Sequence, residues 1–165
     1  MLRDSHGREW QCGTIQLDFV LPQRLDTEYI DAKSQRIRPV MIHHTVFGSL
    51  ERFAAILLEH YEGHLPMWLA PEQVVVAPVA EGQIDYAQRV AAEFERRDLR
   101  VVLDDRAESL ARRIVDAHER GIPVFVVVGT REERDHTVTV RRRVGEPIPM
   151  PLTDAIQQFR SEARL

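Results

Sequence analysis

Apolar positions in the first third of the chain follow two strand patterns with a polar segment between them. Within residues 10–20, the apolar side chains recur at near-strand spacing: Trp10, Cys12, Ile15, Leu17 and Phe19. Residues 40–46 form an apolar, β-branched run, which predicts a buried strand. Residues 21–38 are polar with prolines at their edges, and they predict a loop.

A helical spacing follows the second strand. Ser49 is a suitable N-cap for a helix that runs through Glu62 and ends at Gly63. The next segment, 64–71, is punctuated by prolines and is the best candidate for a domain boundary. We therefore expect two domains, residues 1–70 and residues 71–165.

After residue 71 the pattern changes to alternating strands and helices. Strands are predicted at 73–77, 101–103, 123–128 and 136–143, and helices at 83–97, 110–120 and 150–163. In the last strand Val138 and Val140 alternate with polar neighbours, so one of its faces is expected to meet water. This βαβαβ order predicts an α/β fold with a mixed sheet that is parallel at first.

Composition narrows the class of protein without identifying it. The chain has 165 residues, of which 44% are hydrophobic and 29% charged, as in an ordinary globular protein. No apolar run approaches the roughly 20 residues of a membrane helix, so no membrane partner is expected. Cys12 is the only cysteine, which favours a reducing cytoplasm. The net charge of −4 gives no overall nucleic-acid footprint, and no DNA partner is expected; RNA binding would need a local basic face.

The most informative segment is VMIHHTVFGSLERF, residues 40–53. A strand that feeds a helix start of this kind can hold Arg52 against a bound phosphate. The segment resembles motif 3 of the class II aminoacyl-tRNA synthetases, most closely in the threonyl-tRNA synthetase family. The stretch WQCGTIQLDF, residues 10–19, is similar to the strand that lines the adenylate pocket in that family. Residues 1–70 are thus expected to be an α+β piece of the class II antiparallel sheet.

The resemblance implies roles for individual residues of this segment. Arg52 would contact ATP, and Ser49 belongs to the same motif. Gln11 and Gln16 would lie in the nucleotide and acceptor-end site. His43 would be one of three zinc ligands that recognise the amino and hydroxyl groups of threonine, so zinc and ATP are the implied cofactors. For the isolated chain, His43 as a core histidine bonded to the backbone stays open as an alternative.

Residues 71–165 resemble the anticodon-binding domain that several class II synthetases share. Glu132 and Arg141 stand where the threonyl enzymes have a glutamate and an arginine that recognise anticodon bases. Two positions depart from the family pattern, because Ala107 replaces an asparagine and Gly121 replaces a basic residue. Arg141, Arg142 and Arg143 are either an RNA contact or a solvated strand end.

Motif 3 is the last catalytic motif of the family, yet here it falls in the first third of the chain. We therefore expect the chain to lack motifs 1 and 2 and the other two zinc ligands, and to be inactive alone. Four interpretations stay open: a truncated paralogue that binds threonine tRNA or a partner, half of a split threonine–tRNA ligase, a fragment of an intact enzyme, and a pure protein-interaction module. An uncovered sheet face in residues 1–70 would favour a homodimer or association with another synthetase chain.

Overall fold

A computed structural model of the chain describes residues 1–164. Contacts divide it into two compact units, Met1–His60 and a second unit that starts at Tyr61. Gln73, which is buried, hydrogen-bonds the carbonyl of Met67 and the amide of Arg100, each at 2.8 Å. These bonds tie the proline-rich connector to the second unit. The assignment of domains to 1–70 and 71–165 stays a prediction.

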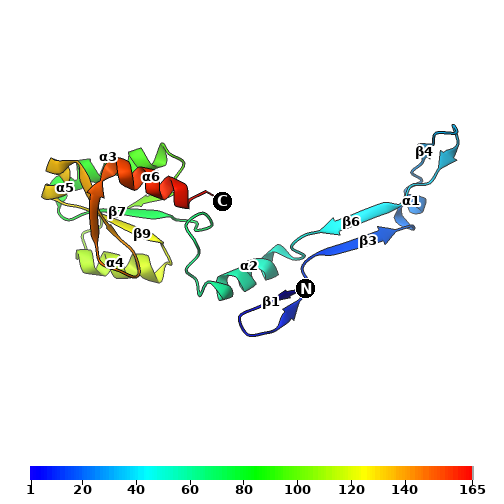
Figure 1. Ribbon diagram of the computed structural model, residues 1–165, viewed down its shortest axis with the longest axis horizontal. Coiled ribbons are helices and arrows are strands. Elements are labelled where there is room, and N and C mark those ends of the chain that lie inside the picture. Colours follow the sequence, from blue (N-terminus) through cyan, green and yellow to red (C-terminus); the bar gives the residue numbers. More distant parts are fainter. Residues whose placement is uncertain (165) are drawn as a thin grey trace. The chain divides into compact units, whose positions relative to one another are not determined.

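The second unit is built on a five-stranded mixed sheet with the strand order β11-β10-β9-β7-β8 (Figure 1). The strands are β7 (Val74–Pro78), β8 (Val101–Leu103), β9 (Val124–Val128), β10 (Thr137–Arg141) and β11 (Ile148–Pro151). Strands β8 and β9 each run parallel to β7, while β10 is antiparallel to both β9 and β11. This arrangement confirms the predicted α/β fold with a mixed sheet.

Helices cover both faces of this sheet, as Figure 1 shows. They are α3 (Ile84–Glu95), which follows the short 3-10 turn η1 (Glu81–Gln83), α4 (Leu110–Glu119), α5 (Thr130–Asp135) and α6 (Leu152–Glu162). On one face Phe94 of α3 and Phe159 of α6 pack with alternate side chains of β7, β9 and β10. On the other face Ala117 of α4 packs with the remaining side chains of β7 and β9.

Two elements of this unit differ from the sequence prediction. Helix α5 was not predicted, because it is only six residues long and strongly charged. The last helix was predicted over residues 150–163, but residues 148–151 form β11 and the helix begins at Leu152. Val138 pairs with Met150 across the two strands. Proline residues hide this strand in the sequence, and they are tolerated because β11 lies at the edge of the sheet.

The first unit consists of three antiparallel strand pairs and two helices. The pairs are β1 (Leu2–Arg3) with β2 (Glu9–Trp10), β3 (Thr14–Asp18) with β6 (Met41–Thr45), and β4 (Tyr29–Ile30) with β5 (Arg36–Ile37). The helices are α1 (Leu21–Arg24) and α2 (Leu50–His60). The predicted loop at 21–38 therefore contains α1 and a small hairpin, and the predicted strand at 10–20 is divided into β2 and β3.

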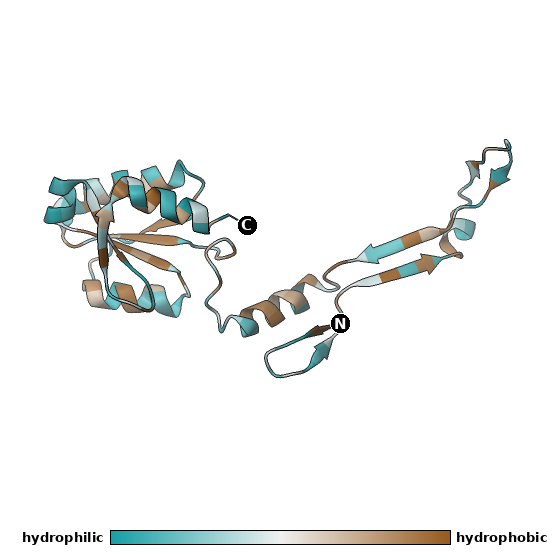
Figure 2. Cartoon of the chain, viewed as in Figure 1, coloured by the Kyte–Doolittle hydropathy of each residue, from teal (hydrophilic) through white to brown (hydrophobic). Residues whose placement is uncertain are grey.

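The prediction that residues 40–46 form a buried strand is wrong in one respect. The strand forms, but the side chains of Ile42 and, on β3, Ile15 and Leu17 are 60–72% exposed. Figure 2 shows apolar stretches along β3 and β6. Within residues 1–60 the sheet has only two strands here and no helix packs on this face, which agrees with the expected uncovered sheet face. No helix among residues 1–164 is long and apolar enough to span a membrane.

Candidate functional site

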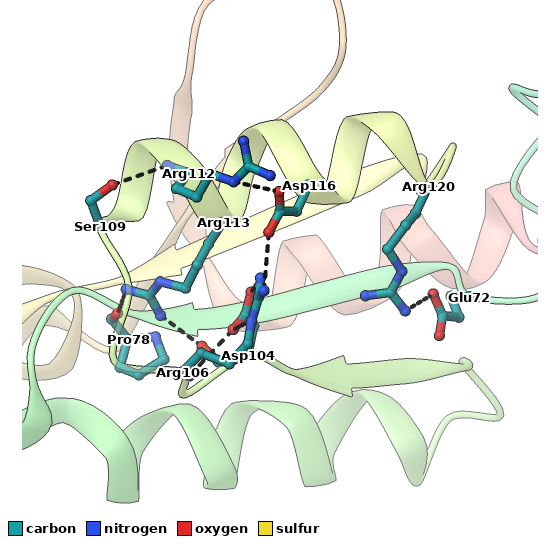
Figure 3. Close-up of polar contacts among 9 residues, drawn as sticks. All are labelled: Glu72, Pro78, Asp104, Arg106, Ser109, Arg112, Arg113, Asp116 and Arg120. Carbon is teal, nitrogen blue, oxygen red and sulfur yellow. Dashed lines mark hydrogen bonds and ion pairs between the residues drawn. The ribbon is translucent and has the colours of Figure 1, made fainter.

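Arg113 closes the edge of the sheet where the parallel strands β7 and β8 end. It lies on α4 and is only 4% exposed. One guanidinium nitrogen donates to the carbonyl of Asp104 and the other to the carbonyl of Pro78, each at 2.7 Å (Figure 3). Its Nε atom is buried and has no hydrogen-bond partner among the described residues. A single cation thus links the ends of two strands to the helix that covers them.

A chain of ion pairs surrounds this arginine, as drawn in Figure 3. Arg106 binds the carboxylate of Asp104 through two nitrogens, at 2.9 and 2.8 Å, and reaches Asp116 at 3.0 Å. Arg112 pairs with the same Asp116 at 2.9 Å. The hydrogen bonds from Arg106 lower the pKa of Asp104, although its burial acts in the opposite direction. Arg106 therefore fixes the loop after β8 by pairing with Asp104 at the start of the loop and with Asp116 on α4.

The segments that follow β7 and β8 line a pocket of about 470 Å³ at the carboxyl ends of the parallel strands. Its lining includes Val79 from the loop after β7, Ile84 from the start of α3, and Ala107 and Glu108 from the loop after β8, with Arg113 in its wall. Ligands of open α/β sheets commonly bind at this edge. The pocket has charged side chains of both signs beside apolar ones. This lining suits a polar, planar ligand better than an aliphatic one.

Glu132 contacts the face of β10 to which Arg141 also belongs. Glu132, on α5, accepts hydrogen bonds from the amide of Gly129 (3.0 Å) and from the hydroxyl of Thr139 (2.8 Å). Arg141 lies two residues beyond Thr139 and therefore shares its face of the strand. Its Nε atom is buried without a hydrogen-bond partner in the described chain. Glu132 thus has a structural task, whereas Arg141 is half-buried and its Nε makes no hydrogen bond within the described residues.

The two positions that depart from the family pattern lie in different places. Ala107 is exposed in the loop after β8 and lines the edge pocket. Gly121 follows α4 at the opposite edge of the sheet, with φ +71°, and a Cβ atom here would clash with the carbonyl oxygen of Gly63. Packing of the connector therefore requires glycine at 121, and a basic side chain would not fit.

In the first unit, Gln16 and His43 stand directly opposite each other on β3 and β6. His43 Nε2 lies 3.2 Å from a carboxylate oxygen of Asp18. The pKa of Asp18 is lowered mainly by hydrogen bonds from the amides of Leu21 and Val20, with a smaller contribution from His43. The structure thus brings two predicted site residues together on the polar face of this strand pair, and it gives His43 a side-chain partner rather than a backbone one.

His43, with Asp18 beside its imidazole, could supply one ligand of a zinc site but does not complete the site. A carboxylate on one imidazole nitrogen is the usual way to orient a metal-binding histidine. Catalytic zinc, however, takes three protein ligands. No group of three His, Cys, Asp or Glu side chains close enough to hold a metal exists within residues 1–164. His43 therefore cannot hold zinc with this chain's described residues alone.

The turn at Gly48 brings the start of α2 against the segment that carries Gln11. Gly48 has φ +71°, and a Cβ atom there would lie 3.0 Å from the carbonyl oxygen of Cys12. The hydroxyl of Ser49 accepts a hydrogen bond from the amide of Arg52 (3.3 Å), as the predicted N-cap should. The backbone at Gln11 therefore lies close to the helix start that carries Ser49 and Arg52.

Arg52 lies over an aromatic ring in this structure. Its guanidinium carbon is 5.9 Å from the centre of the Trp10 ring, a distance typical of a cation–π contact. The indole nitrogen of Trp10 donates to Asp4 at 2.8 Å, and Arg8 donates to the same carboxylate. Burial would raise the pKa of Asp4, but the hydrogen bonds from Trp10 and Arg8 outweigh it and hold the pKa well below its usual range.

Sequence reasoning missed Arg113, although the sequence contains a signal for it. Leu110, Ile114 and Ala117 form the apolar stripe of α4, and Arg113 occupies a position within that stripe. A charged residue at a buried helical position requires partners. The pattern does not reveal that these partners are strand-end carbonyls.

Comparison with known proteins agrees with this geometry. Residues 73–162 match the family described as the anticodon binding domain. Residues 1–61 match the class II core domain of tRNA synthetases (G, H, P, S and T). The chain belongs to the anticodon-binding-domain family of class II tRNA synthetases and carries a segment of their core domain.

Among these enzymes, the chain is similar to threonine–tRNA ligases in particular. It is 50% identical over 143 residues to that of Porphyromonas gingivalis (strain ATCC BAA-308 / W83), a match that covers 87% of this chain and 22% of the relative. It is 47% identical over 163 residues to that of Caulobacter sp. (strain K31), with 98% of this chain and 25% of the relative covered. The chain thus spans about a quarter of the length of these curated relatives.

Solved structures give the same result. The crystal structure described as the RNA binding domain of threonyl-tRNA synthetase from Cryptosporidium parvum Iowa II matches with a TM-score of 0.83 and 37% identity, and it covers 97% of this chain and 41% of that one. A prolyl-tRNA synthetase from Cryptosporidium parvum, with a TM-score of 0.68 and 20% identity, covers 93% of this chain and 36% of that one and shares the fold alone. The predicted resemblance is therefore confirmed.

Proposed function

We propose that this chain binds a threonine tRNA and contacts its anticodon through the face of β10 that carries Thr139 and Arg141. The observation that carries the proposal is Arg141, a half-buried arginine of β10 whose Nε has no partner among the described residues, on an anticodon-binding domain similar to those of threonine–tRNA ligases. Proteins recognise RNA sequence through unstacked bases whose edges accept and donate hydrogen bonds. Arg141 supplies donors, and Glu132 supplies an acceptor that Thr139 and Gly129 hold in place.

Binding of two RNAs tests this proposal. The dissociation constants of a threonine tRNA and of the same tRNA with altered anticodon bases are compared by filter binding. We expect the chain to prefer the unaltered tRNA, and Arg141→Gln to reduce that preference about tenfold, the size of one base contact. Glu133→Gln, which removes a neighbouring charge that pairs with Arg89, is the control and keeps the preference. Equal binding of both tRNAs by the unchanged chain would refute the proposal.

We also propose that the chain by itself does not activate threonine. In a complete enzyme of this type, Gln11, Gln16, Ser49 and Arg52 would contact ATP and the acceptor end, and His43 would hold zinc with ligands supplied by other segments. The support is that His43, oriented by Asp18, supplies one donor where three are needed. Threonine-dependent exchange of pyrophosphate into ATP should be absent for residues 1–165, and exchange by the purified chain would overturn this part.

A second candidate function is protein association through the first unit. The observation that favours it is the apolar face of β3 and β6, where Ile15, Leu17 and Ile42 are 60–72% exposed. Contiguous exposed apolar side chains commonly mark an interface. The occupant would be a second copy of the chain or another synthetase chain. Because the one cysteine, Cys12, is a free thiol, we further propose a cytoplasmic location.

A further inference from the structure

Three arginines gather along the outer surface of α6. A pocket of about 660 Å³ runs beside this helix, and its lining contains no carboxylate: Arg97, Thr153, Ile156, Gln157, Arg160, Ser161 and Arg164. We call these seven residues the α6 basic pocket. Arg97 follows α3, whereas the other six lie on or directly after α6. The two helices meet in the core through Phe94 and Phe159, and this contact holds the two sources of positive charge together.

The charges in this pocket are not neutralised by the protein. Most arginines of the second unit are engaged, as Arg96 is with Glu93 and Arg142 with Glu162. In contrast, the guanidinium groups of Arg97, Arg160 and Arg164 form no ion pair or hydrogen bond to any residue in 1–164. Neither carboxylate of Asp154 or Glu162 on α6 lines the pocket, and Glu162 is paired with Arg142.

The α6 basic pocket and Arg141 lie on opposite faces of the sheet. Helices α3 and α6 cover the face of β10 that carries Val138 and Val140, whereas Arg141 belongs to the other face. Chain direction separates the α6 basic pocket from the edge pocket but not from Arg141, which pairs with Phe125 near the start of β9. α3 runs from the loop after β7 back to the start of β8, so Arg97 lies near the amino ends of the parallel strands. The edge pocket lies at their carboxyl ends.

Phosphate is the chemistry that this lining fits. Guanidinium groups bind phosphate oxygens through paired donors, and the Ser161 hydroxyl and Gln157 amide can donate to the same kind of oxygen. The lining extends along α6 from Thr153 to Arg164, about 16 Å at the helical rise per residue. Such a length serves a chain of phosphates better than one small anion.

A protein partner fits this surface less well. Protein interfaces depend on a few buried aromatic or aliphatic anchors. The only apolar side chain in the lining is Ile156, and it already packs against the core of the domain. Without an anchor, charge alone would have to supply the binding energy, as it does for a nucleic-acid backbone.

We infer that the α6 basic pocket is a second RNA-binding surface that contacts the phosphodiester backbone without regard to sequence. The inference rests on the proposed function, because it takes RNA as the bound polyanion, but it concerns a different face and a different kind of contact. The face of β10 that carries Arg141 selects the RNA by its bases, and α6 adds affinity that is uniform across RNAs.

The test uses the full 165-residue chain and a triple variant, Arg97→Gln/Arg160→Gln/Arg164→Gln. Binding of the threonine tRNA and of an unrelated tRNA is measured between 50 and 200 mM salt. The variant should bind both RNAs about tenfold more weakly, and the slope of log K against log salt should fall by about 2, as expected for lost phosphate contacts. Its preference for the threonine tRNA should be unchanged.

A matched control removes the same charge elsewhere. Arg96→Gln/Arg112→Gln/Arg134→Gln replaces three exposed arginines that pair with Glu93, Asp116 and Asp135. This variant should keep the salt slope of the unchanged chain. Circular dichroism should show both variants folded, because all six side chains are exposed.

Each remaining outcome overturns a defined statement. If the α6 variant matches the unchanged chain or the control, the second surface is refuted while anticodon recognition stands. If the unchanged chain binds no RNA, the proposed function and this inference fail together. If polyglutamate binds the unchanged chain and not the α6 variant, while RNA binding is unaffected, the surface belongs to an acidic protein and the RNA assignment is wrong.

Discussion

Arg113 donates a hydrogen bond of 2.7 Å to the carbonyl oxygen of Pro78, the last residue of β7. The same guanidinium binds the carbonyl after β8, so two strand ends depend on one buried side chain. Aliphatic replacement would leave both carbonyls without partners in a region that excludes water. The cost of such unpaired buried groups is high compared with the net stability of a small domain.

We predict that Arg113→Met lowers the free energy of unfolding of the chain by about 3 kcal/mol. Urea denaturation followed by circular dichroism measures the change. Arg112→Met, at the exposed neighbouring position that pairs with Asp116, should cost less than about 1 kcal/mol. Similar losses in the two variants would show that the strand-end hydrogen bonds contribute little.

Gly121 gives a prediction about the connector. Its φ of +71° is unfavourable for any residue with a side chain, and a Cβ atom would press on the Gly63 carbonyl. Gly121→Ala should therefore destabilise the chain by about 2 kcal/mol, as measured by thermal unfolding. Gly82→Ala is the matched control, because Gly82 has no atoms within 4 Å of its Cβ position. A neutral Gly121→Ala would mean that the connector moves aside freely.

Asp104 predicts a pH dependence of stability. Hydrogen bonds from Arg106 depress its pKa in the folded chain, so the carboxylate contributes stability above the pKa of an unfolded aspartate, about 4. That contribution is lost as the pH falls through the lower, folded pKa. The difference in unfolding free energy between the unchanged chain and Asp104→Asn should thus be largest at neutral pH and shrink below about pH 4. Urea denaturation at a series of pH values measures it, and a constant difference would contradict the assigned role.

The apolar face of β3 and β6 predicts self-association or capture of another chain. At micromolar concentration, light scattering should report species larger than a monomer, and Ile15→Thr/Leu17→Thr/Ile42→Thr should shift them towards the monomer. Threonine keeps strand propensity while it removes apolar surface. The control Val115→Thr/Val144→Thr/Ile148→Thr changes three exposed apolar residues of the second unit and should have no effect. A monomer in the unchanged chain would exclude self-association.

Apart from α5 and β11, the sequence predicts the elements of the second unit because their patterns are local. Residues 124–128 are all apolar and sit at the centre of the sheet, where both faces are covered. The prediction of a buried strand in the first unit was wrong because an apolar strand pattern does not show whether another element packs on that strand. Ile42 has the character of a core residue yet is 64% exposed.

The candidate site divides in the same way. Glu132 and Arg141 are found through resemblance, and strand alternation alone places Arg141 on the face of Thr139. The partners of Arg113 are the carbonyls of Asp104, nine residues away, and of Pro78, 35 residues away at the end of β7. Contacts of this kind arise from tertiary packing and have no trace in neighbouring residues.

The pairing of Gln16 with His43 has a consequence for how the first unit tolerates insertions. Side chains of a strand point alternately to its two sides, so a shift of β6 by a single residue would set Gln16 opposite Ile42 or His44 instead. Polar and apolar side chains would then be mixed on both faces of the β3–β6 strand pair. An insertion or deletion of one residue inside β6 should therefore do more damage than the same change between β4 and β5, where the chain turns in open solvent.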